Sequence, residues 1–206
     1  MTLREKKETM ATQQILTNEQ IRLMRKNVED LKNLGVSASA TIPDMLKDVR
    51  NLEGGPATWK KAAWFAIGDT YKPWLTIANP MQIDYYNDYR LASIGGSIAV
   101  NSLLLDTPDA RRITASSLSK DLYDPDWEDL DKLSEDVTKS LIKGTQNQGA
   151  ELITRIGRQD KRYKGLRLTP RAGACRYCIR TSIDVIESIY FNHFHKNCGC
   201  GKRPSF

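Results

Sequence analysis

Residues 175–178, Cys-Arg-Tyr-Cys, and residues 193–200, His-Phe-His-Lys-Asn-Cys-Gly-Cys, together hold every cysteine and histidine of the chain. Thiolates and imidazoles are the ligands that Zn²⁺ prefers, and four of them around one ion form a closed structural site. The Cys-x-x-Cys turn supplies two ligands, and the later stretch offers three more candidates. We therefore predict a structural zinc site whose ligands come from Cys175, Cys178, His195, Cys198 and Cys200. The favoured set takes one of Cys198 or Cys200 as its fourth ligand, and an all-cysteine set is the nearest alternative.

Two other interpretations of the cysteines compete with zinc. Four cysteines allow three disulfide pairings, and unligated cysteines bury well as small apolar residues. The first ten residues are charged and no apolar run follows them, so we expect no secretory signal and reduced thiols. Chance would not gather all four cysteines beside both histidines. The pattern therefore favours zinc over a disulfide framework and over unligated thiols.

The residues around this cluster predict a small module that depends on the metal. Gly165-Leu-Arg-Leu-Thr-Pro170 alternates apolar and polar residues between Gly and Pro, which predicts a short strand. A segment of about 40 residues has little core of its own. Structural zinc contributes on the order of 10 kcal/mol in apparent binding free energy. We expect residues 165–206 to form a zinc-binding module that contains short β-strands.

Positive charge is concentrated in the same C-terminal part of the chain. Residues 155–206 carry twelve Lys and Arg against three acids, a net charge of +9, so the remainder carries −3 of the overall +6. A basic module on a mildly acidic body predicts an anionic partner, of which nucleic acid is the usual kind. Solvation of a small domain, or neutralisation of acidic neighbours in an assembly, is the alternative. The candidate contacts to nucleic acid or another anionic partner are Arg167, Arg171, Arg176, Arg180, Lys202 and Arg203.

Upstream of the module, hydrophobic periodicity predicts a helical body. Thr17-Asn-Glu-Gln20 forms a capping box before a helix that we expect to end at Gly35. Further helices are predicted over residues 43–52, 58–71, 83–91 and 107–122, and two more after Pro125, separated by the polar stretch 144–149. The predicted fold is therefore mainly α, with a flexible N-terminal tail over residues 1–16, a helical body over 17–164 and the zinc module over 165–206.

Two aromatic stretches of the body invite a functional interpretation. Trp59, Trp64 and Phe65 are better explained as a core wall, with an exposed patch for a partner as the alternative. Tyr85, Tyr86 and Tyr89 stand beside aspartates that would repel phosphate. We interpret these tyrosines as packing and interface residues.

The sequence offers little for catalysis or membrane insertion. Zinc deaminases and zinc proteases need a glutamate at fixed spacing from a ligand histidine, and Lys196 and Asn197 follow His195 here. The Gly-Gly pairs lack the Lys-Ser/Thr that completes a phosphate loop. No apolar run approaches the roughly 18 residues that span a bilayer. We predict no enzymatic activity, no catalytic residues, no small-molecule substrate and no membrane partner.

The order of these C-terminal features resembles a known family. Residues 154–158 (Thr-Arg-Ile-Gly-Arg), the strand at 166–168, the Cys175–Cys178 knuckle, the block from Phe194 to Cys200 and a late Pro204 are similar to the C-terminal part of tailed-phage minor capsid proteins. These are the Mu-type head-morphogenesis proteins and their actinobacterial-phage relatives. The segment 179–194 is more aliphatic and β-branched than that family's pattern, and we expect the chain to lack the additional C-terminal domain that some relatives carry.

The resemblance implies a structural virion protein with an all-α body. Its members act in head assembly or DNA packaging, so the implied partners are the portal or major capsid protein, with packaged DNA as a further partner. The implied location is the head interior or the portal vicinity, and the host cytoplasm during assembly. A free zinc-dependent nucleic-acid-binding protein is the second hypothesis. A zinc-dependent nuclease with His193 as its base is the third.

Overall fold

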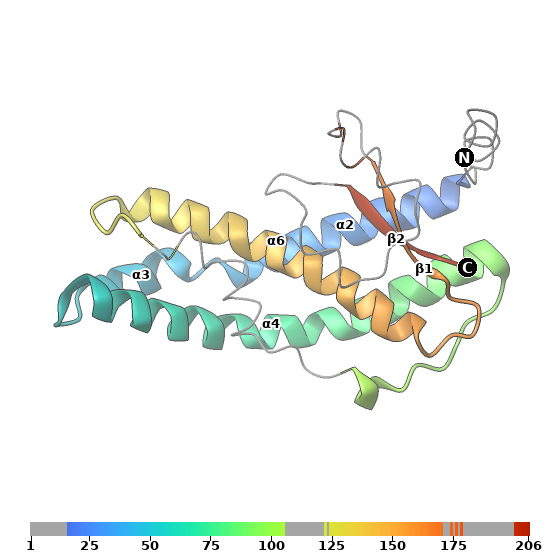
Figure 1. Cartoon of the computed structure of the whole chain (residues 1–206), viewed down its shortest axis with the longest axis horizontal. Coiled ribbons are helices and arrows are strands. Elements are labelled where there is room, and N and C mark those ends of the chain that lie inside the picture. The colour runs from blue at the N-terminus through green and yellow to red at the C-terminus, as the bar shows by residue number, and fades with distance from the viewer. Residues whose placement is uncertain are drawn as a thin grey trace, which may run out of the picture.

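The computed structural model describes residues 16–105, 122, 124–170, 174, 176, 178 and 200–206. Three long helices, α2 (Asn18–Ala38), α4 (Gly55–Ile94) and α6 (Leu130–Gly157), pack side by side, with the short α3 (Ile42–Arg50) at one end. The other elements are a 3₁₀ turn, η1 (Ser102–Leu104), and two strands, β1 (Gly165–Thr169) and β2 (Gly201–Ser205). In Figure 1 the two strands and the C-terminus lie toward the end of the bundle that is opposite α3. The mainly α fold is confirmed.

Helix α2 begins where the sequence predicts and ends later. The Gln20 backbone N–H donates to Thr17 Oγ1 at 3.1 Å, and the Thr17 backbone N–H donates to Gln20 Oε1 at 2.9 Å, which confirms the capping box. The predicted end at Gly35 is wrong, because the helix continues to Ala38. A Cβ on Gly35 would lie 2.7 Å from the Cα of Ile142 on α6. The glycine therefore serves the close approach of two helix backbones and does not cap the helix.

Helix α4 joins two segments that the sequence predicts as separate helices. It runs through 40 residues with Pro73 and Pro80 inside, a length of about 60 Å at 1.5 Å per residue. A proline within a helix removes one backbone hydrogen bond and leaves a carbonyl without its partner. Both prolines are exposed, so water can satisfy those carbonyls. The helix ends at Gly95, where Gly95 and Gly96 have φ values of 78° and 70°.

Helix α6 corrects the prediction of two helices after Pro125. The polar stretch 144–149 lies inside one helix of 28 residues, and Gly144, Thr145, Gln148 and Gly149 are all buried. A Cβ on Gly149 would lie 2.5 Å from Leu31 Cδ1 of α2. The small and polar residues that resemble a loop in the sequence are thus the surface on which neighbouring helices pack.

The two strands form an antiparallel ladder. The register pairs Gly165 with Ser205 and continues to Thr169 opposite Gly201. The predicted strand at Gly165–Pro170 is therefore confirmed as β1, and the predicted extended C-terminal tail is its partner strand.

The buried side chains form two main clusters at opposite ends of the bundle. The α3-end core joins α3, the first half of α4 and the start of α6, and it includes Ile42, Leu46, Ile67 and Val137. The sheet-end core includes three α4 tyrosines, apolar residues of α6, Leu166 and Leu168 of β1, Cys178 and Cys200. The strands therefore share one core with the helical body. Within the described residues, no helix is long and apolar enough to cross a membrane.

Candidate metal centre

The β1–β2 ladder holds together the two ends of the cysteine-containing segment. The last register pair, Thr169 and Gly201, brings Pro170 and Cys200 to neighbouring positions, since directly opposed residues lie about 4.5–5.5 Å apart. Cys178 has no exposed surface and Cys200 is 6% exposed, and both belong to the sheet-end core. The structure thus brings together two of the five predicted ligands from opposite ends of that segment.

The other predicted ligands, Cys175, His195 and Cys198, lie outside the described residues, as does His193. Among the residues that are described, no three His, Cys, Asp or Glu side chains gather into a group that could hold a metal. The zinc site and the choice of its fourth ligand therefore stay predictions. The chemistry of the donors fits Zn²⁺, because two buried thiols in one core are the start of a thiolate-rich site.

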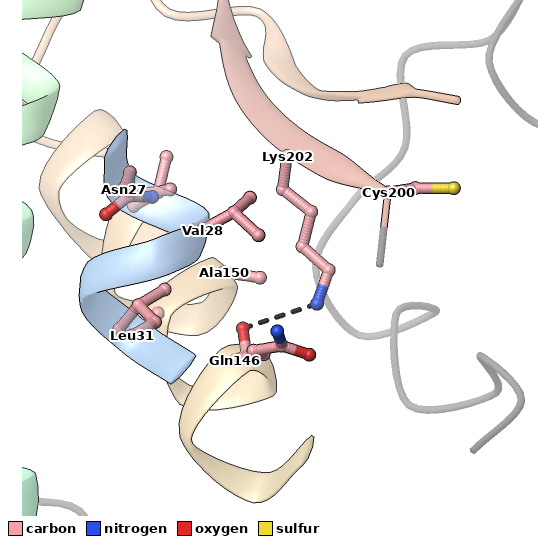
Figure 2. A pocket seen from close by; sticks show the side chains of 9 residues that line it. Asn27, Val28, Leu31, Gln146, Ala150, Cys200 and Lys202 are labelled. Carbon is pink, nitrogen blue, oxygen red and sulfur yellow. Dashed lines mark hydrogen bonds between the residues drawn. The ribbon is translucent and has the colours of Figure 1, made fainter. Parts of the chain in front are cut away.

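A small cavity lies next to Cys200, between α2, α6 and β2. Its lining includes Asn27 and Leu31 of α2, Gly149 of α6, Cys200 and Lys202. The volume of about 20 Å³ is enough for a water molecule and far below that of a small-molecule site. Figure 2 shows the Cys200 side chain pointing away from the helices while the Lys202 side chain extends toward Gln146. This cavity beside Cys200 is too small for a substrate.

Three tyrosines of α4 belong to the same core as the strands. Tyr85, Tyr86 and Tyr89 are at most 6% exposed, which confirms their packing role. The Tyr85 hydroxyl donates to the Lys202 backbone carbonyl at 3.0 Å, and the Tyr86 ring packs edge-on against Phe206 with ring centroids 5.7 Å apart. Burial raises the pKa of all three phenols, so they remain neutral hydrogen-bond donors. Because they face the interior, the expectation that they also form a partner surface is wrong.

A buried ion pair anchors the end of α6 to α4. Arg90 Nε donates to Asp160 Oδ2 at 2.7 Å, and the Tyr86 hydroxyl donates to the same oxygen at 3.1 Å. The Arg162 backbone N–H donates to Asp160 Oδ1 at 2.9 Å. Burial acts to raise the pKa of Asp160, but the hydrogen bonds from Arg90, Arg162 and Tyr86 outweigh it and lower the pKa below its usual value.

This ion pair is not among the features predicted from the sequence. Asp160 is one of only three acids in the basic C-terminal part, and that isolation was the available signal. Its partner Arg90 lies 70 positions earlier, and no local pattern links the two. Arg90 also donates through Nη1 to the carbonyls of Gly95 and Gly96, each at 2.8 Å, so one guanidinium fixes both the helix end and the turn that follows.

The basic residues that the sequence predicts to contact an anionic partner lie in different environments. Arg176 is exposed, whereas Arg203 is 7% exposed. Lys202 Nζ donates to the Gln146 carbonyl at 3.3 Å and to Asn147 Oδ1 at 3.2 Å. Arg167 is partly buried, and Arg171 and Arg180 lie outside the described residues. The described basic residues therefore do not form one exposed stripe.

The described residues define a mainly α protein whose C-terminal strand pair packs on a helical bundle. No family model, curated protein or solved structure matches the chain. Its function therefore has to follow from its own residues and their geometry.

Proposed function

We propose that the protein is a structural minor capsid protein of a tailed phage, with a zinc ion that fixes its C-terminal module. In this role it acts in head assembly or DNA packaging near the portal and catalyses no reaction. The zinc supplies folding free energy by tying the Cys175–Cys178 knuckle to the later cysteine loop. The partners are the portal or major capsid protein, and packaged DNA is a further candidate.

The observation that carries the proposal is the closure of the cysteine-containing segment by β1 and β2. Cys175 and Cys178 follow β1 within a few residues. Because each residue of an extended chain spans at most about 3.6 Å, both cysteines lie within a short reach of the ladder. At the other end of the cysteine-containing segment, Cys200 directly precedes Gly201, the first residue of β2. Cys178 and Cys200 are buried in one core. A ladder that holds both ends of the segment lowers the entropy cost of forming a shared metal site.

An assembly role is also supported by exposed apolar side chains of α4. Trp64 is 38% exposed and Phe65 is 43% exposed on the first half of α4, and Ile77 further along is 46% exposed. Trp59, in contrast, packs edge-on against Trp127 with ring centroids 5.6 Å apart. The aromatic stretch therefore splits into a core part around Trp59 and an exposed apolar part at Trp64 and Phe65. The exposed part is the candidate contact to a shell or portal subunit.

The first test is the metal content of protein purified under reducing conditions. We expect about one tightly held zinc per chain and its loss in Cys178→Ser. Loss of zinc in Cys200→Ser identifies Cys200, and not Cys198, as the fourth ligand. Ala150→Ser is the matched control, because Ala150 is 1% exposed in the same core and offers no thiolate. This control should keep its zinc. Zinc-free parent protein, or zinc retained by both cysteine variants, would contradict the metal assignment.

The second test separates the capsid role from the alternatives. We expect the protein to co-fractionate with purified phage heads and to show no turnover of nucleic acid. A zinc-containing protein that is absent from particles but binds DNA with steep salt dependence would instead support the free nucleic-acid-binding protein. Cleavage of nucleic acid that is lost in His193→Ala would support the nuclease.

A further inference from the structure

Two arginines face each other across the C-terminal ladder. Arg167 of β1 and Arg203 of β2 are directly opposed in the antiparallel register. Side chains of directly opposed residues lie on the same face of the ladder, with Cβ atoms about 4.5–5.5 Å apart. Like charges in that position repel each other and destabilise the pair. The arrangement therefore needs a compensating group.

Among the described residues, the two arginines have little compensation for their charge. Arg203 is 7% exposed, and its Nε donates only to the neutral Thr169 Oγ1, at 3.3 Å. The Nε of Arg167 is buried and has no hydrogen-bond partner. In the part of the chain that the structure describes, neither guanidinium pairs with a carboxylate. Arg90, the other buried arginine of this end, has Asp160 as its counter-ion. A buried charge without a counter-charge is costly.

A third donor lies close to the pair. Tyr89 is 1% exposed and its hydroxyl has no hydrogen-bond partner. Burial raises the pKa of Tyr89, and the nearby positive charge of Arg203 opposes part of that rise. The Arg203 guanidinium therefore lies close to the phenol oxygen. Two guanidiniums and a phenol gather here. Among the described residues, Arg203 Nε has only the neutral Thr169 Oγ1 as an acceptor, and Arg167 Nε has none.

We propose that Arg167 and Arg203 form a binding site for a small phosphate-like oxyanion, with Tyr89 as a supporting donor. Guanidinium forks match the oxygens of phosphate, and pairs of this kind are among the strongest hydrogen-bonded contacts in proteins. One bound anion would offset two positive charges. The burial of Arg203 favours a free ion over the backbone of duplex DNA. This proposal does not depend on the capsid role or on zinc.

Thermal unfolding tests the site in sodium phosphate at about 1–20 mM, with sodium chloride holding the ionic strength constant. Phosphate at about ten times its dissociation constant should raise the Tm of the parent by roughly 4 °C. Arg203→Met and Arg167→Met should lose this response. In chloride alone, Arg203→Met should be at least as stable as the parent, because it removes a buried charge that has no counter-ion.

The matched control is Arg22→Met, since Arg22 is exposed and pairs with Glu19 on the same helix. It should keep the full phosphate response. An equal Tm for the parent in phosphate and chloride would overturn the proposal, as would an unchanged response in both ladder variants. Phosphorus NMR of the parent should show broadening of the phosphate signal that Arg203→Met abolishes. If a DNA duplex displaces phosphate from the parent, the phosphate group that the site takes is that of nucleic acid.

Discussion

The two ends of the bundle are held together by different means. The α3-end core is built from aliphatic side chains together with the aromatic Tyr71 and Trp127. Among the described residues its polar contacts are chiefly those of the Tyr71 hydroxyl with Thr145 Oγ1 and the Leu141 carbonyl. The sheet-end core surrounds three tyrosines, an ion pair and two cysteines. Apolar packing tolerates many arrangements of similar volume, whereas buried polar groups require specific partners. The sheet end should therefore be the more sensitive to single polar substitutions.

The largest effect is expected from Asp160→Ala at the sheet end. The substitution leaves Arg90 buried without its counter-ion and removes the acceptor of the Tyr86 hydroxyl. Breaking a buried ion pair in this way costs about 3–5 kcal/mol, and the carbonyls of Gly95 and Gly96 keep part of the Arg90 hydrogen bonding. We expect a loss near 3 kcal/mol in the free energy of unfolding, measured by urea denaturation.

Two variants sharpen this result. Glu19→Ala breaks an ion pair that is exposed on both sides and should leave the unfolding midpoint unchanged. The double variant Arg90→Met with Asp160→Leu removes both charges and should recover much of the stability lost in Asp160→Ala. A single Asp160→Ala variant as stable as the parent would show that the ion pair does not hold the sheet end.

A smaller effect is expected where α2 and α6 approach through glycine. In Gly35→Ala the new Cβ meets the Ile142 backbone at 2.7 Å, and backbone cannot move aside. Overpacking of this kind costs about 1–3 kcal/mol, and the helix preference of alanine returns about 1 kcal/mol. We expect a net loss of about 1 kcal/mol in the same urea measurement.

Gly149→Ala is the matched comparison toward the sheet end. There the new Cβ meets the end of the Leu31 side chain at 2.5 Å, and Leu31 lines the cavity beside Cys200. The side chain can shift into that space, so stability should stay the same or rise slightly. The interpretation fails if Gly149→Ala is the more destabilising of the two.

The smallest effect is expected in the pH dependence of the free energy of unfolding, to which Asp160 contributes in acid. Its pKa is lowered in the folded state, against about 3.9 in an unfolded chain. The stabilisation is therefore complete above about pH 4 and is lost as the pH falls further, through the folded pKa. Urea midpoints measured between about pH 5 and pH 2 should fall more steeply for the parent than for Asp160→Asn. Equal slopes would mean that Asp160 titrates alike in both states.

The sequence alone determined the features that depend on neighbouring residues. The capping box at Thr17 and Gln20 and the strand from Gly165 follow from local hydrogen bonding and alternation, and both are present. The helical, mainly α character follows from apolar periodicity. The cysteine and histidine pattern predicts zinc ligands in the same local way, and Cys178 and Cys200 lie buried in one core.

Only the tertiary structure decided what the glycines, prolines and buried charges do. Gly35 and the stretch 144–149 resemble a helix end and a loop, yet both lie within helices, because a neighbouring backbone or side chain occupies the space beside them. The Arg90–Asp160 pair and the opposition of Arg167 to Arg203 join positions far apart in the chain. Such contacts depend on how whole helices and strands pack, and no local pattern encodes them.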